Sequence, residues 1–218
     1  MKLYSYFRSS ASYRVRIALN LKGLPYETVS VHLLKDGGQQ FAPEYLRLNP
    51  DAVVPALVDD STEPAAVLTQ SLAIIEYLEE THPAPPLLPQ DPADRAYLRS
   101  LALTIACEIH PLNNLRVLRY LVRELKVGED DKNAWYRHWC EHGLASLEAM
   151  LACDRRTGTF CYGDAPSLAD CFLIPQVANA QRMNCDLSRV PTIMRINEAC
   201  LALDAFADAM PARQPDAE

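Results

Sequence analysis

A proline-rich segment constrains the architecture of this chain more than any other feature. Residues 82–92 contain five prolines in eleven positions. Proline fixes φ and lacks an amide hydrogen, so such a run forms a stiff extended connection rather than a helix or a strand. Short alternating apolar runs precede it, and helical spacing follows it. The pattern therefore predicts two domains, residues 1–81 and residues 93–218, joined by a linker at 82–92.

The first domain begins with a strand, a helix and a second strand. Residues 2–6 alternate as a short strand does, and apolar side chains then recur at helical spacing from Ala11 to Lys22. Gly23 follows, as is common after the last turn of a helix. Residues 26–31 are rich in β-branched side chains, and a connecting helix would place them parallel to the first strand. This is a βαβ unit.

The rest of the first domain indicates a hairpin and a final helix. A loop and a short helical stretch lead to strands expected at residues 53–59 and 66–69, which would pair with each other. Pro55 stands at the start of the first of these strands, a position that tolerates proline. Ser71 is expected to cap the helix that follows. The first domain is therefore α/β.

The second domain is expected to be entirely helical. Helical periodicity covers residues 96–125, 132–153, 167–181 and 191–209. Proline in the pair His110-Pro111 should break or kink the first of these helices. Ser167 and Asp170 have the spacing of a capping box at the start of the third.

Composition and charge exclude several functional classes. The formal net charge is −7, and the basic residues form no run longer than Arg155-Arg156, which argues against a nucleic-acid surface. The sequence contains neither a long apolar span nor an apolar segment of signal-peptide type at the start. The seven cysteines lack C-x-x-C spacing, which favours reduced thiols in the cytoplasm over disulfides or a metal site.

The distribution of the cysteines is more informative than their number. None precedes Cys107, so the α/β domain has no thiol. Its first helix begins instead near Ser9, Ser10 and Ser12, at a helix N-terminus, where free amide groups favour an anion. Serines in this position commonly serve as helix caps alone. Any sulfur chemistry in this domain must use a thiol supplied by a bound cofactor.

The chain contains the stretches YFRSSASYRVRIAL at residues 6–19, DGGQQF at 36–41, LNP at 48–50, Val54-Pro55, QSLAIIEYL at 70–78, IHPLNN at 109–114 and PQV at 175–177. Together these stretches resemble the zeta class of the cytosolic glutathione transferases, which includes the maleylacetoacetate isomerases. The first stretch is similar to the Ser-Ser-Cys-Ser signature of that class. Ala11 departs from the pattern, because many members have cysteine there. A covalent or redox role of that cysteine is therefore impossible in this chain.

The resemblance implies a thioredoxin-like domain that binds glutathione, followed by an all-helical domain that binds the substrate. Ser9 is the first choice for the hydrogen-bond partner of the glutathione thiolate, and Ser10 the second. The Val54 backbone would pair with the cysteinyl unit, next to a cis peptide bond at Pro55. Gln70 and Ser71 would hold the γ-glutamyl carboxylate. Gln40 would reach the glycyl end, with His32 or Lys35 as its neighbours.

The resemblance also implies a reaction, the glutathione-dependent cis–trans isomerisation of maleylacetoacetate to fumarylacetoacetate in tyrosine and phenylalanine breakdown. The substrate is a dicarboxylate, which arginine side chains would hold. Arg8 and Arg182 are the candidates, with His110 and Asn114 lining the same cleft. Arg8 is also the candidate for stabilising charge in the transition state. A histidine before a proline inside a helical pattern is more often a packing or kink residue than a general base, so His110 has this explanation as well.

Three alternatives remain at this stage. A maleylpyruvate isomerase of the gentisate pathway would use the same chemistry on a related substrate. A general glutathione transferase or a dehalogenase of halo-acids would use the same thiolate. A non-catalytic module on the same fold is disfavoured, because the serines and the Gln70-Ser71 pair are present. The resemblance further implies a homodimer.

Overall fold

The computed structural model describes all 218 residues and divides them into two compact units. Met1–Leu87 and Ala202–Glu218 form the first unit, and Leu88–Leu201 form the second. The first unit has mixed α/β structure and the second is helical, which confirms the fold class expected from the sequence.

The first unit is built on a four-stranded sheet. Its strands are β1 (Lys2–Ser5), β2 (Glu27–Ser30), β3 (Ala56–Asp59) and β4 (Ala66–Thr69), in the order β2-β1-β3-β4. Strand β1 is parallel to β2 and antiparallel to β3, and β3 and β4 form the predicted hairpin. This is the thioredoxin-like arrangement that the resemblance implies, with β3 beginning directly after Pro55.

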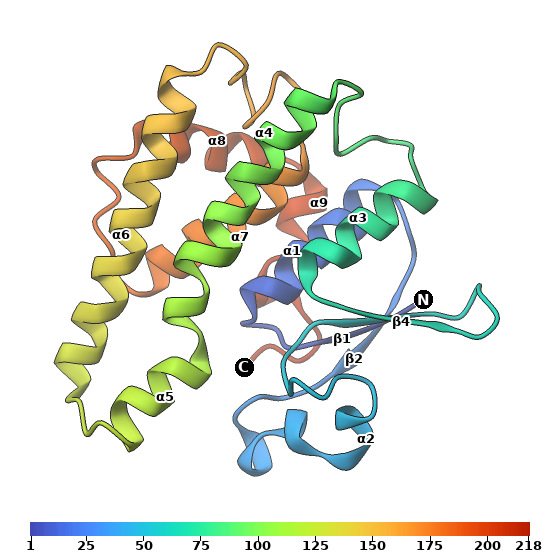
Figure 1. Ribbon diagram of the computed structural model, residues 1–218, viewed down its shortest axis with the longest axis vertical. Helices are drawn as coiled ribbons and strands as arrows, with labels where there is room; N and C mark the ends of the chain where they lie inside the picture. The colour runs from blue at the N-terminus through green and yellow to red at the C-terminus, as the bar shows by residue number, and fades with distance from the viewer. The chain divides into compact units, whose positions relative to one another are not determined.

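Helices cover both faces of this sheet. Helices α1 (Ser10–Leu21) and α3 (Ser71–Thr81) lie on one face, and the short α2 (Pro43–Leu46) lies on the other (Figure 1). Two 3-10 turns, η1 (Lys35–Gly37) and η2 (Gln39–Phe41), precede α2. A buried cluster forms near the end of β1 and consists of Tyr6, Phe7, Val31, Tyr45, Val54 and Ala56. This cluster brings the segment after β1, the segment after β2 and the segment before β3 together, and each of these segments carries predicted site residues.

The C-terminal segment does not belong to the helical unit in which the sequence places it. Ala202–Glu218 contains α9 (Asp204–Ala207) and the 3-10 turn η5 (Pro211–Arg213), and it packs within the first unit. Buried polar groups of α1 bind it: Arg16 Nε donates to the Ala209 carbonyl at 3.0 Å, and the Tyr13 hydroxyl donates to the Phe206 carbonyl at 3.3 Å. A buried guanidinium must find acceptors, and this segment supplies one.

The second unit consists of helices in series. They are α4 (Pro92–Leu103), a π-helical turn η3 (Thr104–Ile109), a 3-10 turn η4 (Pro111–Asn113), α5 (Leu115–Arg123), α6 (Glu129–Cys153), α7 (Leu168–Arg182) and α8 (Pro191–Leu201). The first of these begins earlier than the sequence indicated. Asp91 caps it by accepting from the Ala93 amide at 2.9 Å, and Pro92 takes the first helical position, where its missing N–H costs nothing.

Two expectations for this unit are confirmed. The long helical pattern is interrupted around His110-Pro111, where the π-helical turn ends and α5 begins soon after. Ser167 and Asp170 form the predicted capping box, in which the buried Asp170 carboxylate accepts from the Ser167 amide at 2.8 Å. Gly143 of α6 is required by packing, because a Cβ there would lie 2.3 Å from Ile109.

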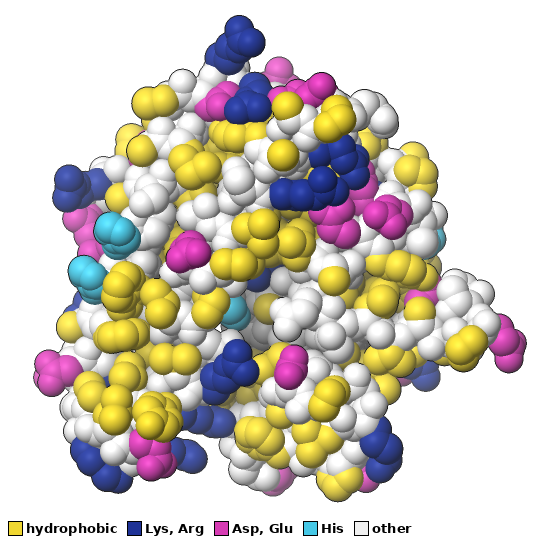
Figure 2. Space-filling view, viewed as in Figure 1, with side chains coloured by type: hydrophobic (Ala, Val, Ile, Leu, Met, Phe, Trp, Pro, Cys, Tyr) yellow, Lys and Arg dark blue, Asp and Glu magenta, His cyan; other side chains and the backbone are white.

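The face shown in Figure 2 has no large basic region, as the net charge of −7 and the absence of long basic runs indicate. On this face, basic side chains lie in small separate groups among acidic and apolar ones (Figure 2). No helix has both the length and the apolar composition needed to cross a membrane. No group of three or more His, Cys, Asp and Glu side chains lies close enough together to bind a metal ion.

Candidate functional site

The turn between β1 and α1 carries Arg8, Ser9 and Ser10. Ser9 is the N-cap of α1, and its Oγ accepts a hydrogen bond from the Ser12 amide at 3.2 Å. The capping interpretation of Ser9 is therefore correct. It does not exclude a second role, because the hydroxyl can donate its own hydrogen while it accepts from Ser12. Ser9 is half-buried, whereas Ser10 is buried as the first residue of the helix.

Arg8 and His32 flank this turn. The Arg8 side chain is exposed, and its guanidinium carbon lies 4.9 Å from the centre of the Phe7 ring. His32 is buried, with its ring centre 4.8 Å from that of Tyr6. His32 Nδ1 accepts hydrogen bonds from two backbone amides, so the neutral ring carries its proton on Nε2. Nε2 has no hydrogen-bond partner within the chain. The nearest anion in the chain is the Glu218 carboxylate, 3.6 Å away, so this donor faces negative charge.

Gln40 lies nearby in the turns that precede α2. Its side chain is 4% exposed, and its Oε1 atom has no hydrogen-bond partner within the chain. The side chain packs against Gly38, where a Cβ would lie 2.7 Å from Gln40 Nε2. Gly38 also has φ +110°, which side-chain-bearing residues rarely adopt. The loop is therefore shaped around a buried amide group whose oxygen is unsatisfied, a feature typical of a ligand contact.

The Val54–Pro55 peptide bond is cis, as expected. The preceding carbonyl, that of Val53, accepts from the Tyr45 hydroxyl at 2.6 Å and from Asn49 Nδ2 at 2.7 Å. Burial raises the pKa of Tyr45 to about 12, so this hydroxyl keeps its proton at neutral pH. No hydrogen bond within the chain uses the backbone of Val54. Its amide and carbonyl can therefore pair with a peptide-like ligand.

The pair Gln70-Ser71 differs in one respect from the expectation. Ser71 is not the cap of α3, because Gln70 occupies the N-cap position and Ser71 begins the helix. The Ser71 hydroxyl instead accepts from Nη1 of the buried Arg14 at 3.2 Å, which brings the starts of α1 and α3 together. Gln70 has φ +67° although it is not glycine. Such a conformation costs of order 1 kcal/mol or more and persists where function or packing demands it.

The remaining predicted residues lie in the second unit. His110 Nε2 and Asn114 Nδ2 are 3.4 Å apart, and Asn114 also caps α5. Arg182 is exposed at the end of α7, where Nη2 donates to Asn179 Oδ1 at 3.4 Å. Burial raises the pKa of the neighbouring Tyr136, and a hydrogen bond with Arg182 opposes that shift. The structure thus places His110 with Asn114, while Arg182 lies on a separate helix.

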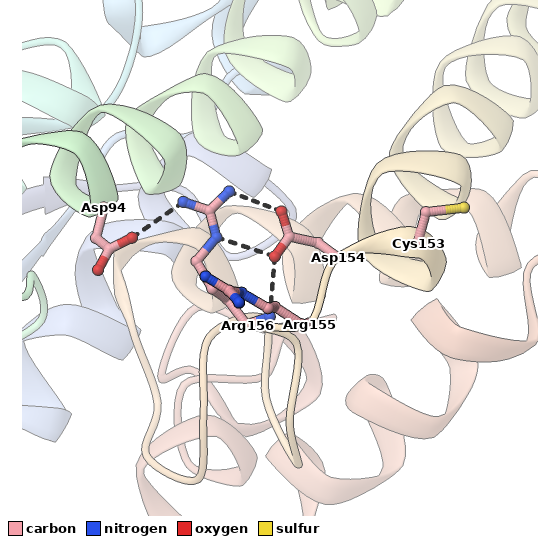
Figure 3. Close-up of a pocket in the computed structure, with 5 residues that line it drawn as sticks. All are labelled: Asp94, Cys153, Asp154, Arg155 and Arg156. Atoms are coloured by element: carbon pink, nitrogen blue, oxygen red, sulfur yellow. Dashed lines mark hydrogen bonds and ion pairs between the residues drawn. The ribbon is translucent and has the colours of Figure 1, made fainter.

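The second unit also has an open pocket of about 440 Å³ that contains none of the predicted site residues. Its lining residues are Asp94, Cys153, Asp154, Arg155 and Arg156 (Figure 3). Arg156 is held by both carboxylates, at 2.7 Å from Asp154 and 3.0 Å from Asp94. This pairing lowers the pKa of Asp154 to about 2. Because two carboxylates already neutralise Arg156, this arginine is not available to bind an anionic ligand in the pocket.

Sequence reasoning missed the contribution of the chain's last residues. Asp216 accepts hydrogen bonds from the Phe7 amide and from the Ser30 hydroxyl, both at 3.1 Å. The Glu218 carboxylate pairs with Lys35 and lies 3.6 Å from His32 Nε2. No local pattern in the sequence connects residues more than 180 positions apart, so no signal indicated these contacts.

The first unit therefore presents an anion-favouring helix start, an unpaired backbone edge and a buried donor and acceptor around one apolar cluster. Such a set fits a ligand with a peptide backbone and carboxylates. Residues 3–86 match the family model described as glutathione S-transferase, N-terminal domain. The chain belongs to the glutathione S-transferase family.

Within that family, its similarity extends over the whole length to zeta-class isomerases. The probable maleylacetoacetate isomerase of Vibrio cholerae is 51% identical over 215 residues, which cover 99% of this chain and 97% of that protein. The holo structure of a bacterial zeta-class maleylpyruvate isomerase has TM-score 0.94 and 47% identity, with full coverage of both chains. A maleylacetoacetate isomerase from Methylobacterium extorquens AM1, solved with bound malonate and GSH, has TM-score 0.94 and 45% identity, again with full coverage.

Proposed function

We propose that this chain is a glutathione-dependent cis–trans isomerase that converts maleylacetoacetate to fumarylacetoacetate. The proposal rests on one observation above all, the Ser9-capped start of α1 in a unit that contains no cysteine. A site built in this way can stabilise a thiolate but cannot supply one. The full-length similarity to isomerases of this substrate class supports the choice of reaction.

The residues of the first unit suit each part of glutathione. Val54 offers an unpaired backbone edge to the cysteinyl unit, next to the cis bond at Pro55. Gln70 and Ser71 at the start of α3 would hold the γ-glutamyl carboxylate. At the glycyl end, Gln40 offers an acceptor and His32 Nε2 a donor; both are buried and without hydrogen-bond partners in the chain. The unsatisfied Gln40 oxygen supports the fit, because buried polar groups are normally hydrogen-bonded. His32 Nε2 faces the Glu218 carboxylate at 3.6 Å, so this position accepts a carboxylate near the ring.

The bound cofactor would supply a thiol nucleophile. Its reversible addition to the conjugated double bond of the substrate would make rotation about that bond possible. The chain's own task is electrostatic. Ser9 donates a hydrogen bond to the sulfur, and the amides at the start of α1 favour its ionised form. A free thiol has a pKa of about 8.5, so lowering this pKa raises the reactive fraction at neutral pH. Ser10 is the alternative donor.

Substrate charge would be managed by arginine. Arg8 adjoins Ser9 and is exposed, so it is suited to stabilise negative charge that develops on a substrate oxygen during addition. Arg182, His110 and Asn114 of the second unit are proposed to bind the distal part of the substrate. A dicarboxylate substrate agrees with the malonate found in the Methylobacterium relative.

The proposal is tested by following the loss of maleylacetoacetate absorbance with and without added glutathione, on dialysed protein. We expect turnover to depend on glutathione and glutathione to be recovered unchanged. Equal rates in its absence would refute the cofactor role. The same assay on maleylpyruvate tests the second candidate function, which the 47% identity to a maleylpyruvate isomerase favours. The substrate with the higher kcat/KM identifies the activity.

We further propose that the protein acts in the cytoplasm as a homodimer. The acidic composition and the free cysteines agree with a reducing compartment. Sedimentation equilibrium at micromolar concentration tests the assembly. A mass of about twice 24.4 kDa supports it, and a mass of 24.4 kDa at every concentration contradicts it.

A further inference from the structure

One constraint on the β1–α1 turn comes from the far end of the chain. Tyr6 and Ser9 close the turn, since the Ser9 amide donates to the Tyr6 carbonyl at 2.9 Å. Phe7 and Arg8 are its central residues. The Phe7 amide donates to Asp216 Oδ2 at 3.1 Å, across 209 positions of sequence. A residue in the C-terminal segment thus holds the turn that carries Arg8 and Ser9.

The carbonyl group of Phe7 is also bound by a side chain. The Phe7 carbonyl accepts from Arg16 Nη2 at 3.2 Å, and Arg16 is fully buried in α1. Arg16 also donates to the Ser5 hydroxyl and to the Ala209 carbonyl, each at 3.0 Å. Both backbone polar groups of Phe7 are therefore bound by side chains of opposite charge. This arrangement fixes the peptide planes on either side of Phe7, and with them the direction in which the chain leaves toward Ser9.

Asp216 is itself oriented by a second contact. The Ser30 hydroxyl, at the end of β2, donates to the same Oδ2 atom at 3.1 Å. Asp216 also lies close enough to Arg16 to oppose the effect of burial, which lowers the pKa of Arg16 to about 10. Two donors and a buried cation therefore face this one carboxylate.

We infer that Asp216 is a positioning residue for the proposed reaction: by accepting from the Phe7 amide it fixes the turn so that Ser9 and Arg8 face the bound thiol and the substrate. This inference rests on the proposed function of Ser9. Charge-assisted hydrogen bonds to a backbone amide are stronger than neutral ones, so a carboxylate suits the task. Small displacements of a catalytic group cost large factors in rate, so loosening this turn has a measurable effect.

The test uses the full chain and four variants. Asp216→Ala removes the acceptor, and Asp216→Asn keeps an oxygen acceptor but loses the charge. Ser30→Ala removes one of the two donors that orient Asp216. Asp208→Ala is the matched control, because this aspartate lies in the same C-terminal segment but pairs with Arg213 on the surface. Thermal unfolding first establishes that each variant is folded.

Two readouts go beyond turnover. Amide hydrogen exchange of residues 7–10 in the free protein reports on the turn directly. The ultraviolet absorbance of the thiolate, titrated in the complex with glutathione, gives the pKa of the bound thiol. In Asp216→Ala we expect Phe7 exchange to accelerate about tenfold or more and the thiolate fraction at neutral pH to fall about tenfold. Asp216→Asn and Ser30→Ala should each shift both values in the same direction as Asp216→Ala by a smaller but measurable factor, because the first loses the charge and the second loses one orienting donor. Asp208→Ala should match the wild type.

Unchanged exchange and thiol titration in folded Asp216→Ala would overturn the inference. So would equal changes in Asp208→Ala, which would indicate a general loosening of the segment. Should Asp216→Ala not fold, Ser30→Ala and Asp216→Asn decide, and wild-type values in both contradict the inference. A wild-type protein that forms no thiolate with glutathione refutes the proposed function instead, while the exchange experiment still tests whether Asp216 holds the turn.

Discussion

Substitution of Ser9 separates its two roles, because alanine and glycine differ as helix caps but both lack a hydroxyl. In the structure Ser9 Oγ accepts from the Ser12 amide at 3.2 Å. Losing such a cap to alanine costs about 1 kcal/mol, whereas glycine at an N-cap costs a few tenths. For a chain of this size, 1 kcal/mol corresponds to a fall of about 2–4 °C in melting temperature. We therefore expect Ser9→Ala, but not Ser9→Gly, to melt measurably lower.

The chemical effect should be the same in both variants. A hydrogen bond to a charged group is worth about 1.5–3 kcal/mol, and 1.36 kcal/mol corresponds to one unit of pKa. Both variants should therefore raise the pKa of the bound thiol by about one to two units and lower kcat/KM at neutral pH about 10- to 100-fold. Glutathione affinity should change little, because the proposed carboxylate and backbone contacts lie at Val54, Gln70 and Ser71.

The assay is a thiolate absorbance titration of the glutathione complex, accompanied by thermal unfolding and steady-state kinetics. Ser10→Ala is the control, since Ser10 lies inside the first turn of α1. A normal thiol titration in both Ser9 variants would refute the role of Ser9. A shift in Ser10→Ala alone would assign the role to Ser10. A thiol shift in Ser9→Ala that is absent in Ser9→Gly would show that capping of α1, and not the hydroxyl, controls the sulfur.

Three further predictions concern arginines. Arg8→Ala should mainly lower kcat and Arg182→Ala should mainly raise KM, and each effect should correspond to no more than about 2–4 kcal/mol. Steady-state kinetics measure both constants, and near-normal values in both variants would show that neither arginine contacts the substrate. Arg16→Met should lower the free energy of unfolding by about 3 kcal/mol, because three buried acceptors lose their donor, and a urea melt within 1 kcal/mol of wild type would contradict this. Arg156→Gln removes the partner that lowers the pKa of Asp154 to about 2. The ionised Asp154 carboxylate stabilises the folded chain at pH values above its unfolded pKa of about 3.9, and this stabilisation is lost as the pH falls toward about 2. The difference in melting temperature between wild type and Arg156→Gln should accordingly be constant above pH 5 and shrink below pH 4, and a difference that grows in acid would refute the pairing.

Local patterns in the sequence were sufficient for most of the fold. Alternation at residues 2–6, helical spacing after Ala11 and the proline at position 55 each predict the element that the structure contains, since each depends on neighbours along the chain. Element boundaries follow less directly from local patterns. The proline-rich pattern places Pro92 in the linker, whereas in the structure Pro92 begins α4, because proline serves both as a helix breaker and as a first helical residue.

The candidate site was predictable in part. The turn at Ser9 and the cis bond at Pro55 follow from motifs that are contiguous in sequence. The partner of Ser71 was not predictable, because Arg14 lies 57 positions away in the sequence and meets Ser71 only where α1 and α3 pack together. The same applies to Asp216, whose contact with Phe7 depends on the return of the C-terminal segment to the first unit. Nothing near Asp216 in the sequence distinguishes it from a surface aspartate.

The central claim is that the first unit supplies no thiol of its own and that catalysis requires the sulfur of bound glutathione. It is tested most directly by comparing glutathione with S-methylglutathione, which keeps both carboxylates and the peptide backbone but has no ionisable thiol. The account predicts that S-methylglutathione competes with glutathione for binding and supports no isomerisation of maleylacetoacetate. Isomerisation with S-methylglutathione at a rate comparable to that with glutathione would contradict the account.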